Sequence, residues 1–164
     1  FAMVITQTEK LVTQIVSKMT ASADDQKDLV QEIYLKAYQN LSHFQFKSKL
    51  STWIATIAYN TTVNYLQKKK IPIVGNEKVM EGELTISENP ASALVKTEAN
   101  EILYVEINKL PPLYKTLITL YHLEELSNKE ISEITGLPEG TIKSYLYRAR
   151  KILKDKINDH YKNE

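Results

Sequence analysis

Apolar residues recur three or four positions apart along most of the first seventy residues, which is the spacing of an amphipathic helix. The pattern predicts helices over residues 4–19, 25–41 and 51–70, with polar residues in the short connections between them. Three helices joined by short connections pack readily into one bundle. Residues 1–70 are therefore expected to form a small helical domain.

The next stretch has a different composition and no sustained apolar period. In residues 71–90, four of the chain's helix breakers stand among Glu, Asn and Ser residues: Pro72, Gly75, Gly82 and Pro90. A loop of about twenty residues is unusual inside one compact domain. We therefore expect a flexible linker over residues 71–90 and a second domain over residues 91–164.

The second domain is also expected to be helical, with helices over residues 91–109, 111–122, 127–136 and from 138 onward. Ser127 and Glu130 have the spacing of a capping box, which marks a helix start. Gly136 suits the left-handed position that follows a helix end. The fold class is thus all-α, with two small helical domains joined by a flexible linker.

Composition narrows the possible functions. Only four Gly and five Pro occur among 164 residues, too few for the turns of a β-sandwich or barrel. Cysteine is absent, the three histidines are scattered, and no phosphate-binding glycine loop or hydrolase motif is present. We therefore expect no metal, no cofactor and no catalytic residue. No apolar run approaches the roughly 20 residues of a membrane span, so a cytoplasmic protein is expected.

Charge is balanced overall, at +1, but segregated along the chain. Residues 33–76 contain six Lys and no acidic residue, residues 77–108 contain seven Glu and two Lys, and residues 137–156 contain six basic and two acidic residues. Two basic segments fit a polyanion bound at two places. The same charge runs also occur on solvated faces of ordinary helices.

Residues 127–153 combine a capped helix, a turn with glycine and a basic helix, which is the order of a helix-turn-helix motif. The N-terminal part of its second helix meets base edges in the major groove. With Ile142 facing inward, the residues expected to face DNA are Thr141, Lys143, Ser144 and Tyr145, followed by Arg148, Arg150 and Lys151. The alternative is an ordinary helix pair with a basic surface.

Two segments resemble a known family. The runs DLVQEIYLKAY at 28–38 and LSTWIATIAYN at 50–60 resemble region 2 of the sigma-70 family. The second half, with Leu110-Pro111, GLPEGTIKS at 136–144 and RAR at 148–150, is similar to region 4. Together they cover nearly the whole chain in the right order, leaving no room for regions 1 and 3. The group they resemble is that of the extracytoplasmic-function (ECF) RNA polymerase sigma factors.

The resemblance implies two roles for region 2. It implies binding to the β′ clamp helices of core RNA polymerase through Asp28, Gln31, Glu32 and Leu35. It also implies that region 2 holds the opened −10 element, which requires aromatic residues for stacking and cations for the backbone. The expected −10 residues are Phe46, Lys47, Lys49, Asn60, Asn64, Tyr65, Lys68 and Lys69. Asn64 and Gln67 stand where Asp and Arg are frequent, which leaves the −10 sequence preference open.

For region 4, the resemblance implies reading of the −35 element through Lys143, Ser144, Tyr145 and Arg148. Tyr145 stands where Arg is common, so the −35 motif can differ from the usual one. Region 4 of the family also docks on the β flap, and the candidate residues for that surface are Leu113, Leu117 and Leu120. Core packing is the stronger expectation for these three leucines. It is also the stronger expectation for Trp53 in region 2. An anti-sigma factor is expected as a further partner, with the linker allowing the domains to close on it or spread over polymerase.

We therefore expect a sigma factor that binds core polymerase and directs promoter-specific initiation. The alternative is a free-standing helix-turn-helix regulator whose N-terminal bundle forms a dimer. A nucleic-acid enzyme is a third possibility, disfavoured because the basic segments lack clustered carboxylates or histidines. The promoter sequence, the inducing signal and the open or compact arrangement of the domains are not specified by the sequence.

Overall fold

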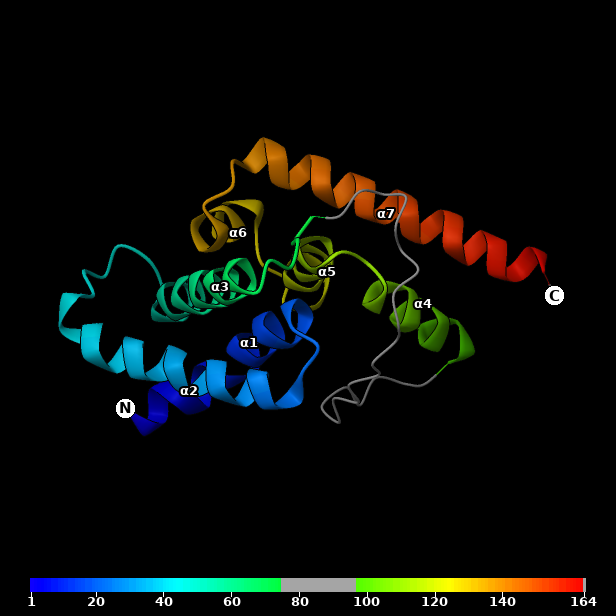
Figure 1. Ribbon diagram of the computed structural model, residues 1–164. Coiled ribbons are helices and arrows are strands. Elements are labelled where there is room, and N and C mark those ends of the chain that lie inside the picture. Colours follow the sequence, from blue (N-terminus) through cyan, green and yellow to red (C-terminus); the bar gives the residue numbers. More distant parts are fainter. Residues whose placement is uncertain (75–96, 164) are drawn as a thin grey trace.

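The computed structural model describes residues 1–74 and 97–163, and all regular elements in them are helical (Figure 1). The helices are α1 (Ala2–Met19), α2 (Ala23–Asn40), α3 (Leu50–Lys68), α4 (Glu98–Asn108), α5 (Pro112–Ile118), α6 (Asn128–Thr135) and α7 (Glu139–Lys162). A 3-10 turn, Leu41–His43, follows α2, and a π-helical turn, Thr119–Leu123, extends α5. The expected all-α fold is confirmed.

Helix positions agree with the apolar spacing to within a few residues wherever the chain is described. Ile71–Val74 are not helical, as expected at the start of the linker. The rest of the expected linker, and residues 91–96 of the expected fourth helix, lie outside the described residues. The division into domains at residues 70 and 91 stays a prediction.

The helices α1, α2 and α3 form the N-terminal bundle, with each helix contacting the other two. The start of α2 is capped by Ser22, whose hydroxyl accepts a hydrogen bond from the backbone N–H of Asp25. Asp24 and Asp25 lie in its first turn, where a negative charge is favourable beside free backbone N–H groups. Inside the bundle, the hydroxyls of Thr8 and Tyr34 lie 2.9 Å apart and satisfy one another.

The helices α6 and α7 form the expected helix-turn-helix pair. The capping box is present: Ser127 accepts from the N–H of Glu130 at 3.1 Å, and the carboxylate of Glu130 accepts from the N–H of Ser127 at 2.9 Å. Gly136 ends α6 with φ of 73°, in the left-handed region that favours glycine. Three residues later α7 begins, with Ile142, Leu146, Ala149 and Leu153 buried as expected.

The two halves of the chain pack against one another. Helix α1 contacts α5, and α3 contacts α6 (Figure 1). The buried apolar residues of both halves form a single cluster. The N–H of Leu113 in α5 also donates to the carbonyl of Ile73 at 2.9 Å. The three leucines considered for the flap surface are almost fully buried, which confirms their expected place in the core: Leu113, Leu117 and Leu120.

Two lysines lie in the contact between α1 and the second half of the chain. Lys18 is only 7% exposed; its ammonium group lies 3.5 Å from both the Tyr104 hydroxyl and the Asn108 side-chain oxygen, and over the Tyr104 ring. Burial, reinforced by the positive charge of Lys18, lowers the pKa of Lys115 in α5 to about 8. This contact therefore favours the neutral form of Lys115.

We expect Lys115→Met to raise the free energy of unfolding by about 1–3 kcal/mol at pH 7, because it removes a cation that burial disfavours. Since the folded state loses this proton near pH 8 and the unfolded state near 10.5, the wild type gains stability relative to the variant as pH rises through that interval. Urea unfolding of both proteins at pH 7 and pH 9.5 checks this. A difference that is independent of pH would contradict the assignment.

The turn before α7 supplies a second prediction. Gly136→Ala should lower the free energy of unfolding by about 1 kcal/mol or more, because a Cβ is disfavoured at positive φ; nothing lies within 4 Å of that Cβ, so no clash contributes. The matched control is Gly140→Ala, which lies in α7 in open space and should be neutral or stabilising by about 0.5 kcal/mol. Urea unfolding of the two variants separates backbone strain from crowding; equal effects would contradict this reason.

Candidate nucleic-acid and polymerase interface

The outer face of α2 carries the residues expected to contact polymerase. Asp28, Gln31, Glu32 and Leu35 are all exposed, and their spacing places them on one side of the helix. Leu35 is 57% exposed, which is high for a large apolar residue in a helix that packs on two others. Tyr38 is 64% exposed and lies one turn beyond Leu35, so it extends this face. The sequence analysis did not include Tyr38 in this face, although its spacing of three residues from Leu35 places both side chains on the same side of the helix.

The loop between α2 and α3 presents a run of aromatic rings. Trp53 is half-buried against the core, as expected; its ring centroid lies 5.2 Å from that of Phe44, which lies 4.7 Å from that of Phe46. Phe46 has φ of 56°, uncommon for a bulky residue, and its side chain is 86% exposed. The three aromatic rings therefore form a row of neighbouring side chains that runs from the core to the exposed end of the loop.

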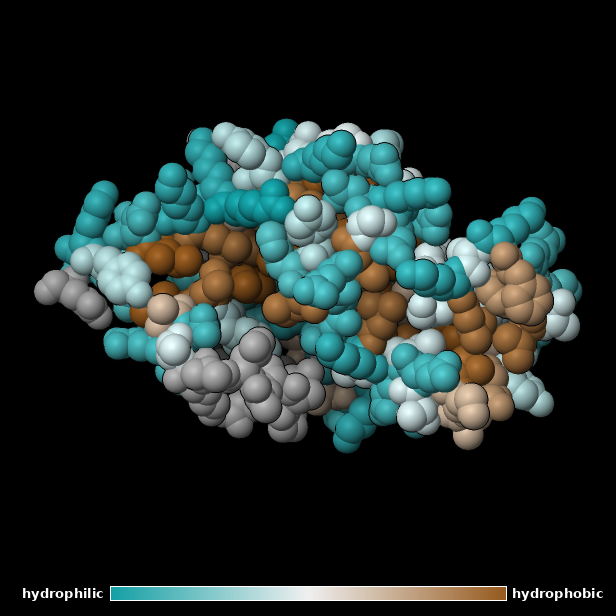
Figure 2. All heavy atoms as spheres, turned by 180° about the vertical axis from the view of Figure 1, so that it is seen from behind, coloured by the Kyte–Doolittle hydropathy of each residue, from teal (hydrophilic) through white to brown (hydrophobic). Residues whose placement is uncertain are grey.

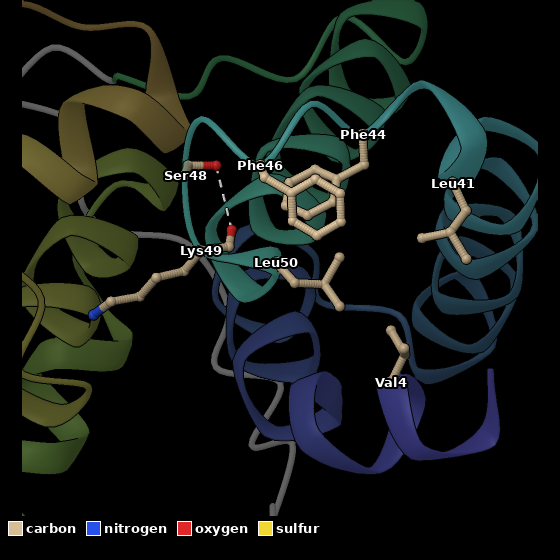
Figure 3. A pocket seen from close by; sticks show the side chains of 7 residues that line it. All are labelled: Val4, Leu41, Phe44, Phe46, Ser48, Lys49 and Leu50. Carbon is tan, nitrogen blue, oxygen red and sulfur yellow. Dashed lines mark hydrogen bonds between the residues drawn. The ribbon is translucent and has the colours of Figure 1, made fainter.

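The rings of Phe44 and Phe46 border an open pocket of about 560 Å³ (Figure 3). Val4 and Leu41 close it from the side of α1 and α2, while Leu50 lies beneath the rings. Lys49 belongs to the lining but directs its ammonium group away from the apolar side chains. An apolar pocket lined by aromatic rings has the chemistry of a site for a nucleobase.

Beyond the pocket, the polar candidates of region 2 lie on the loop and on α3. Asn60 and Asn64 are exposed and one turn apart, so they share one side of α3, and Lys47 and Lys68 are exposed as well. Tyr65 is different: it is half-buried and its hydroxyl donates a hydrogen bond to the carboxylate of Asp25.

Lys69 completes a cluster around that carboxylate. Its ammonium group lies 3.6 Å from Asp25 and over the ring of Tyr65 at 5.2 Å. The hydrogen bond from Tyr65, and then the charge of Lys69, hold the pKa of Asp25 below its usual value, and the same bond raises the pKa of Tyr65. This cluster joins the end of α3 to the start of α2. The proposed stacking role of Tyr65 and phosphate role of Lys69 stay predictions, and both side chains already have partners.

Helix α7, the expected recognition helix, presents only part of the expected set to solvent. Lys143, Ser144, Arg148 and Lys151 are exposed, whereas Thr141 and Tyr145 are half-buried. The expectation that Tyr145 faces outward is wrong: its ring centroid lies 5.4 Å from that of Tyr114 in α5, because residue 145 lies beside the buried Leu146 and Ala149 rather than opposite them. The guanidinium of Arg148 covers the Tyr145 ring at 5.8 Å.

Tyr147 was not among the residues of α7 that the sequence analysis expected to face DNA. It is 68% exposed and lies one turn from both Lys143 and Lys151, on the side of α7 opposite its buried stripe. The apolar spacing contained the signal, since position 147 lies away from Ile142 and Leu146.

Arg150 is exposed but held in place. Its Nε donates to His122 Nε2 at 3.1 Å, and its guanidinium lies 5.2 Å from the Tyr121 ring centroid. Burial, and then the charge of Arg150, lower the pKa of His122, which favours the neutral imidazole that can accept this bond. Both partners of Arg150 lie in the π-helical turn after α5.

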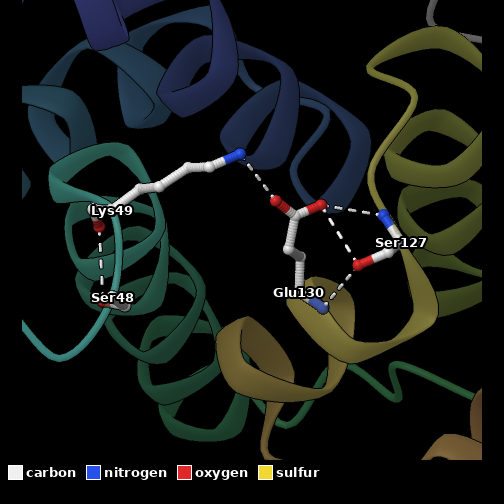
Figure 4. Close-up of polar contacts among 4 residues, drawn as sticks. All are labelled: Ser48, Lys49, Ser127 and Glu130. Atoms are coloured by element: carbon white, nitrogen blue, oxygen red, sulfur yellow. Dashed lines mark hydrogen bonds and ion pairs between the residues drawn. The ribbon is translucent and has the colours of Figure 1, made fainter.

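One expected −10 residue contacts the helix-turn-helix domain. The ammonium group of Lys49 lies 3.0 Å from the carboxylate of Glu130, whose other oxygen belongs to the capping box with Ser127 (Figure 4). The N–H of Ser127, and then Lys49, lower the pKa of Glu130, so this carboxylate is charged at neutral pH.

The rear face shows a different surface character. Hydrophobic side chains gather along its middle, with hydrophilic ones along its upper edge (Figure 2). Among the described apolar residues, Leu103 and Val105 of α4 are 36% and 42% exposed. Within residues 1–74 and 97–163, no three His, Asp or Glu side chains are grouped to hold a metal ion. No helix of these same residues has both the length and the apolar character to cross a membrane.

Comparison with known proteins gives matches to both halves of the chain. Residues 4–71 match the family described as "Sigma-70 region 2", and residues 100–153 match "Sigma-70, region 4". The ECF RNA polymerase sigma factor SigW of Bacillus subtilis is 30% identical, over 97% of this chain and 89% of its own length. The ECF RNA polymerase sigma-E factor of Haemophilus influenzae is 35% identical, over 90% of this chain and 79% of its own length.

A solved structure has the same fold. The sigma factor RpoE from Bartonella quintana, solved with the anti-sigma factor NepR, superposes with a TM-score of 0.68 at 21% identity, covering 94% of each chain. Together with the two regional matches and the two relatives, the findings show that this chain belongs to the ECF group of the sigma-70 family of RNA polymerase sigma factors. Members of this family are initiation factors rather than enzymes.

Proposed function

We propose that this sigma factor binds core RNA polymerase and directs initiation by contacting the −10 and −35 elements with two differently built surfaces. The observation that carries this proposal is the pairing of an aromatic pocket on one half with a helix-turn-helix on the other. Unstacked bases need ring faces and a cation nearby, whereas duplex DNA needs a helix that enters the major groove.

In the proposed division of labour, residues 1–70 form the domain that binds the polymerase clamp and the −10 element. The exposed face of α2 around Leu35 binds the β′ clamp helices, supported by its polar neighbours and by the exposed ring of Tyr38. The loop before α3 receives the non-template strand, with Phe46 stacking on a base and Lys47 and Lys49 on the backbone. Asn60 and Asn64 provide amide groups for base edges on the same side of α3.

Residues 91–164 form the proposed −35 domain, joined by a linker over residues 71–90. Lys143, Ser144 and Tyr147 meet base edges, while Arg148 and Lys151 contact phosphates. Arg150 contacts the backbone from the edge of this face, where His122 and Tyr121 restrict its side chain. A restricted guanidinium loses less conformational freedom on binding.

Three further proposals concern partners and location. Control by an anti-sigma factor is supported by the family and by the similarly folded RpoE, which was solved with NepR. A cytoplasmic location follows from the proposed partners, because promoter DNA and RNA polymerase must be reached together. The β flap is the proposed contact of region 4 on polymerase.

The test is reconstituted transcription with core polymerase, with and without the full chain, followed by sequencing of transcript 5′ ends from genomic fragments. New start sites that share two upstream motifs about 25 base pairs apart, or about 85 Å of B-form DNA, would support the proposal. Tight promoter binding without polymerase, combined with no new starts, would contradict it and favour a free-standing regulator.

Phe46→Ala should weaken promoter opening, because it removes one exposed stacking surface worth about 1–3 kcal/mol per base. Folding should be unaffected, since the side chain is 86% exposed. The measurement is the stability of open complexes on a promoter carrying a fluorescent base in the −10 element. Tyr161→Ala, which removes another exposed aromatic ring at the far end of α7, is the matched control and should behave as wild type.

Lys143→Ala should weaken binding of the holoenzyme to the −35 element and relax the base preference there, because the ammonium group is proposed to meet a base edge; the salt slope of binding should change little. Lys27→Ala, an exposed lysine on α2, is the control for loss of one positive charge. Titrations at several salt concentrations, on promoters with unchanged and altered −35 bases, separate the two variants. A salt slope reduced by about one, with an unchanged base preference, would instead assign Lys143 to a phosphate.

A further inference from the structure

Helix α5 packs on both α1 and α4, and two lysines lie at this junction (Figure 1). Lys18 of α1 is 7% exposed and Lys115 of α5 is half-buried, and the charge of Lys18 acts on Lys115. Within residues 1–74 and 97–163, the ion pairs include neither of them. Burying a cation without a counter-charge is costly. The junction therefore carries positive charge that no described carboxylate balances.

The acidic residues of α4 near this junction are directed elsewhere. Glu106 lies two positions from Tyr104, so the two do not share a side of the helix, and its carboxylate accepts a hydrogen bond from Lys109 at 2.8 Å. Glu101 lies one turn before Tyr104, but it is exposed and pairs with neither lysine of the junction. The counter-charge does not come from α4.

The present partners of Lys18 are neutral and far away for an ammonium group. Its Nζ lies 3.5 Å from the Tyr104 hydroxyl and 3.5 Å from the Asn108 side-chain oxygen, beyond the ordinary length of such a hydrogen bond. The hydroxyl hydrogen of Tyr104 and the amide N–H groups of Asn108 donate to no described residue. The junction thus gathers four hydrogen-bond donors, two of them cationic.

From these observations we infer that the junction of α1, α4 and α5 is a binding site for a phosphate group. The residues that bind it are Lys18, Lys115, Tyr104 and Asn108. A tetrahedral oxyanion accepts hydrogen bonds on several sides, which suits donors that converge from three helices, and bonds from ammonium groups to an anion are strong. The inference does not depend on the proposed function, because none of these residues is proposed to contact DNA or polymerase.

Burial favours a small ligand over a nucleic-acid strand or an acidic peptide. With Lys18 only 7% exposed, the backbone of a polymer cannot reach its ammonium group without parting the helices. Lys115, Tyr104 and Asn108 are half-buried, which leaves a small anion access from solvent. A phosphate group, free or at the end of a metabolite, carries close to two negative charges near neutral pH and matches two ammonium groups.

The protonation of Lys115 links binding to pH. In the empty site, burial and the charge of Lys18 lower its pKa to about 8, whereas a bound dianion favours the ammonium form. Affinity should therefore fall between pH 7 and pH 9.5, as the empty site loses the Lys115 proton. Phosphate itself becomes fully dianionic over this interval, so its own titration acts in the opposite direction.

The test is urea unfolding of the full chain at pH 7 with sodium phosphate added at constant ionic strength. Phosphate should stabilise the wild type in a saturable way, and its apparent affinity for Lys115→Met should be at least about tenfold weaker. The stability advantage expected of Lys115→Met should shrink as phosphate is added. Lys129→Met is the matched control, because Lys129 is an exposed lysine of α6, a helix that packs on α3 and α7.

A second variant keeps both charges and removes one donor. Tyr104→Phe should weaken phosphate binding by about three- to tenfold, because it deletes a single hydrogen bond to the anion. Glycerol 3-phosphate then separates the two sources of the group. Equal or tighter binding than inorganic phosphate supports a site for a phosphorylated metabolite, and binding at least about tenfold weaker supports a site for the free anion.

Three results would overturn the inference. The first is equal stabilisation of Lys115→Met and Lys129→Met by phosphate, which is what a general salt effect produces. The second is stabilisation of the wild type that does not saturate, or that Tyr104→Phe leaves unchanged. The third is an affinity that rises from pH 7 to pH 9.5, because the titration of phosphate rather than that of Lys115 would then control binding.

Discussion

The structure depends on the burial of α3 on several sides at once. This helix packs on α1 and α2 within the N-terminal bundle and on α6 of the other half. Small side chains allow the close approach: Ala55 and Ala58 are fully buried. Its buried threonines do not leave polar atoms unsatisfied, since the hydroxyl of Thr62 donates to the carbonyl of Ala58 at 2.8 Å. A helix buried in this way positions the aromatic loop before it and the helix-turn-helix beside it.

Local signals made much of the fold readable from the sequence, because they act over a few residues. The capping box at Ser127 and Glu130, and the left-handed Gly136, are interactions between near neighbours in the chain. The regular apolar stripe of α7 likewise fixed which residues are buried and left Lys143 and Lys151 exposed. Such features require no knowledge of what else the helix contacts.

Tertiary contacts explain what the sequence did not reveal. Tyr145 is turned inward by Tyr114, and Tyr65 is engaged by Asp25 forty residues earlier; neither partner can be inferred from helical spacing. The packing of α3 on α6 could not be predicted either, because the apolar residues of each helix have the spacing expected for packing within their own domain. The family resemblance suggested roles for individual residues. The left-handed backbone of Phe46 and the pocket beside it became evident only from the structure.

Phe46 has a consequence for the way this protein can change. A bulky residue with φ of 56° costs about 1–2 kcal/mol relative to a relaxed backbone, and its exposed ring recovers little of that by burial. Selection for heat tolerance alone would therefore favour glycine or asparagine at position 46. A lineage or library that gained stability by this route would keep its fold and lose the ring that is proposed to meet the opened strand. At this position, stability against heat would oppose the proposed role in promoter melting.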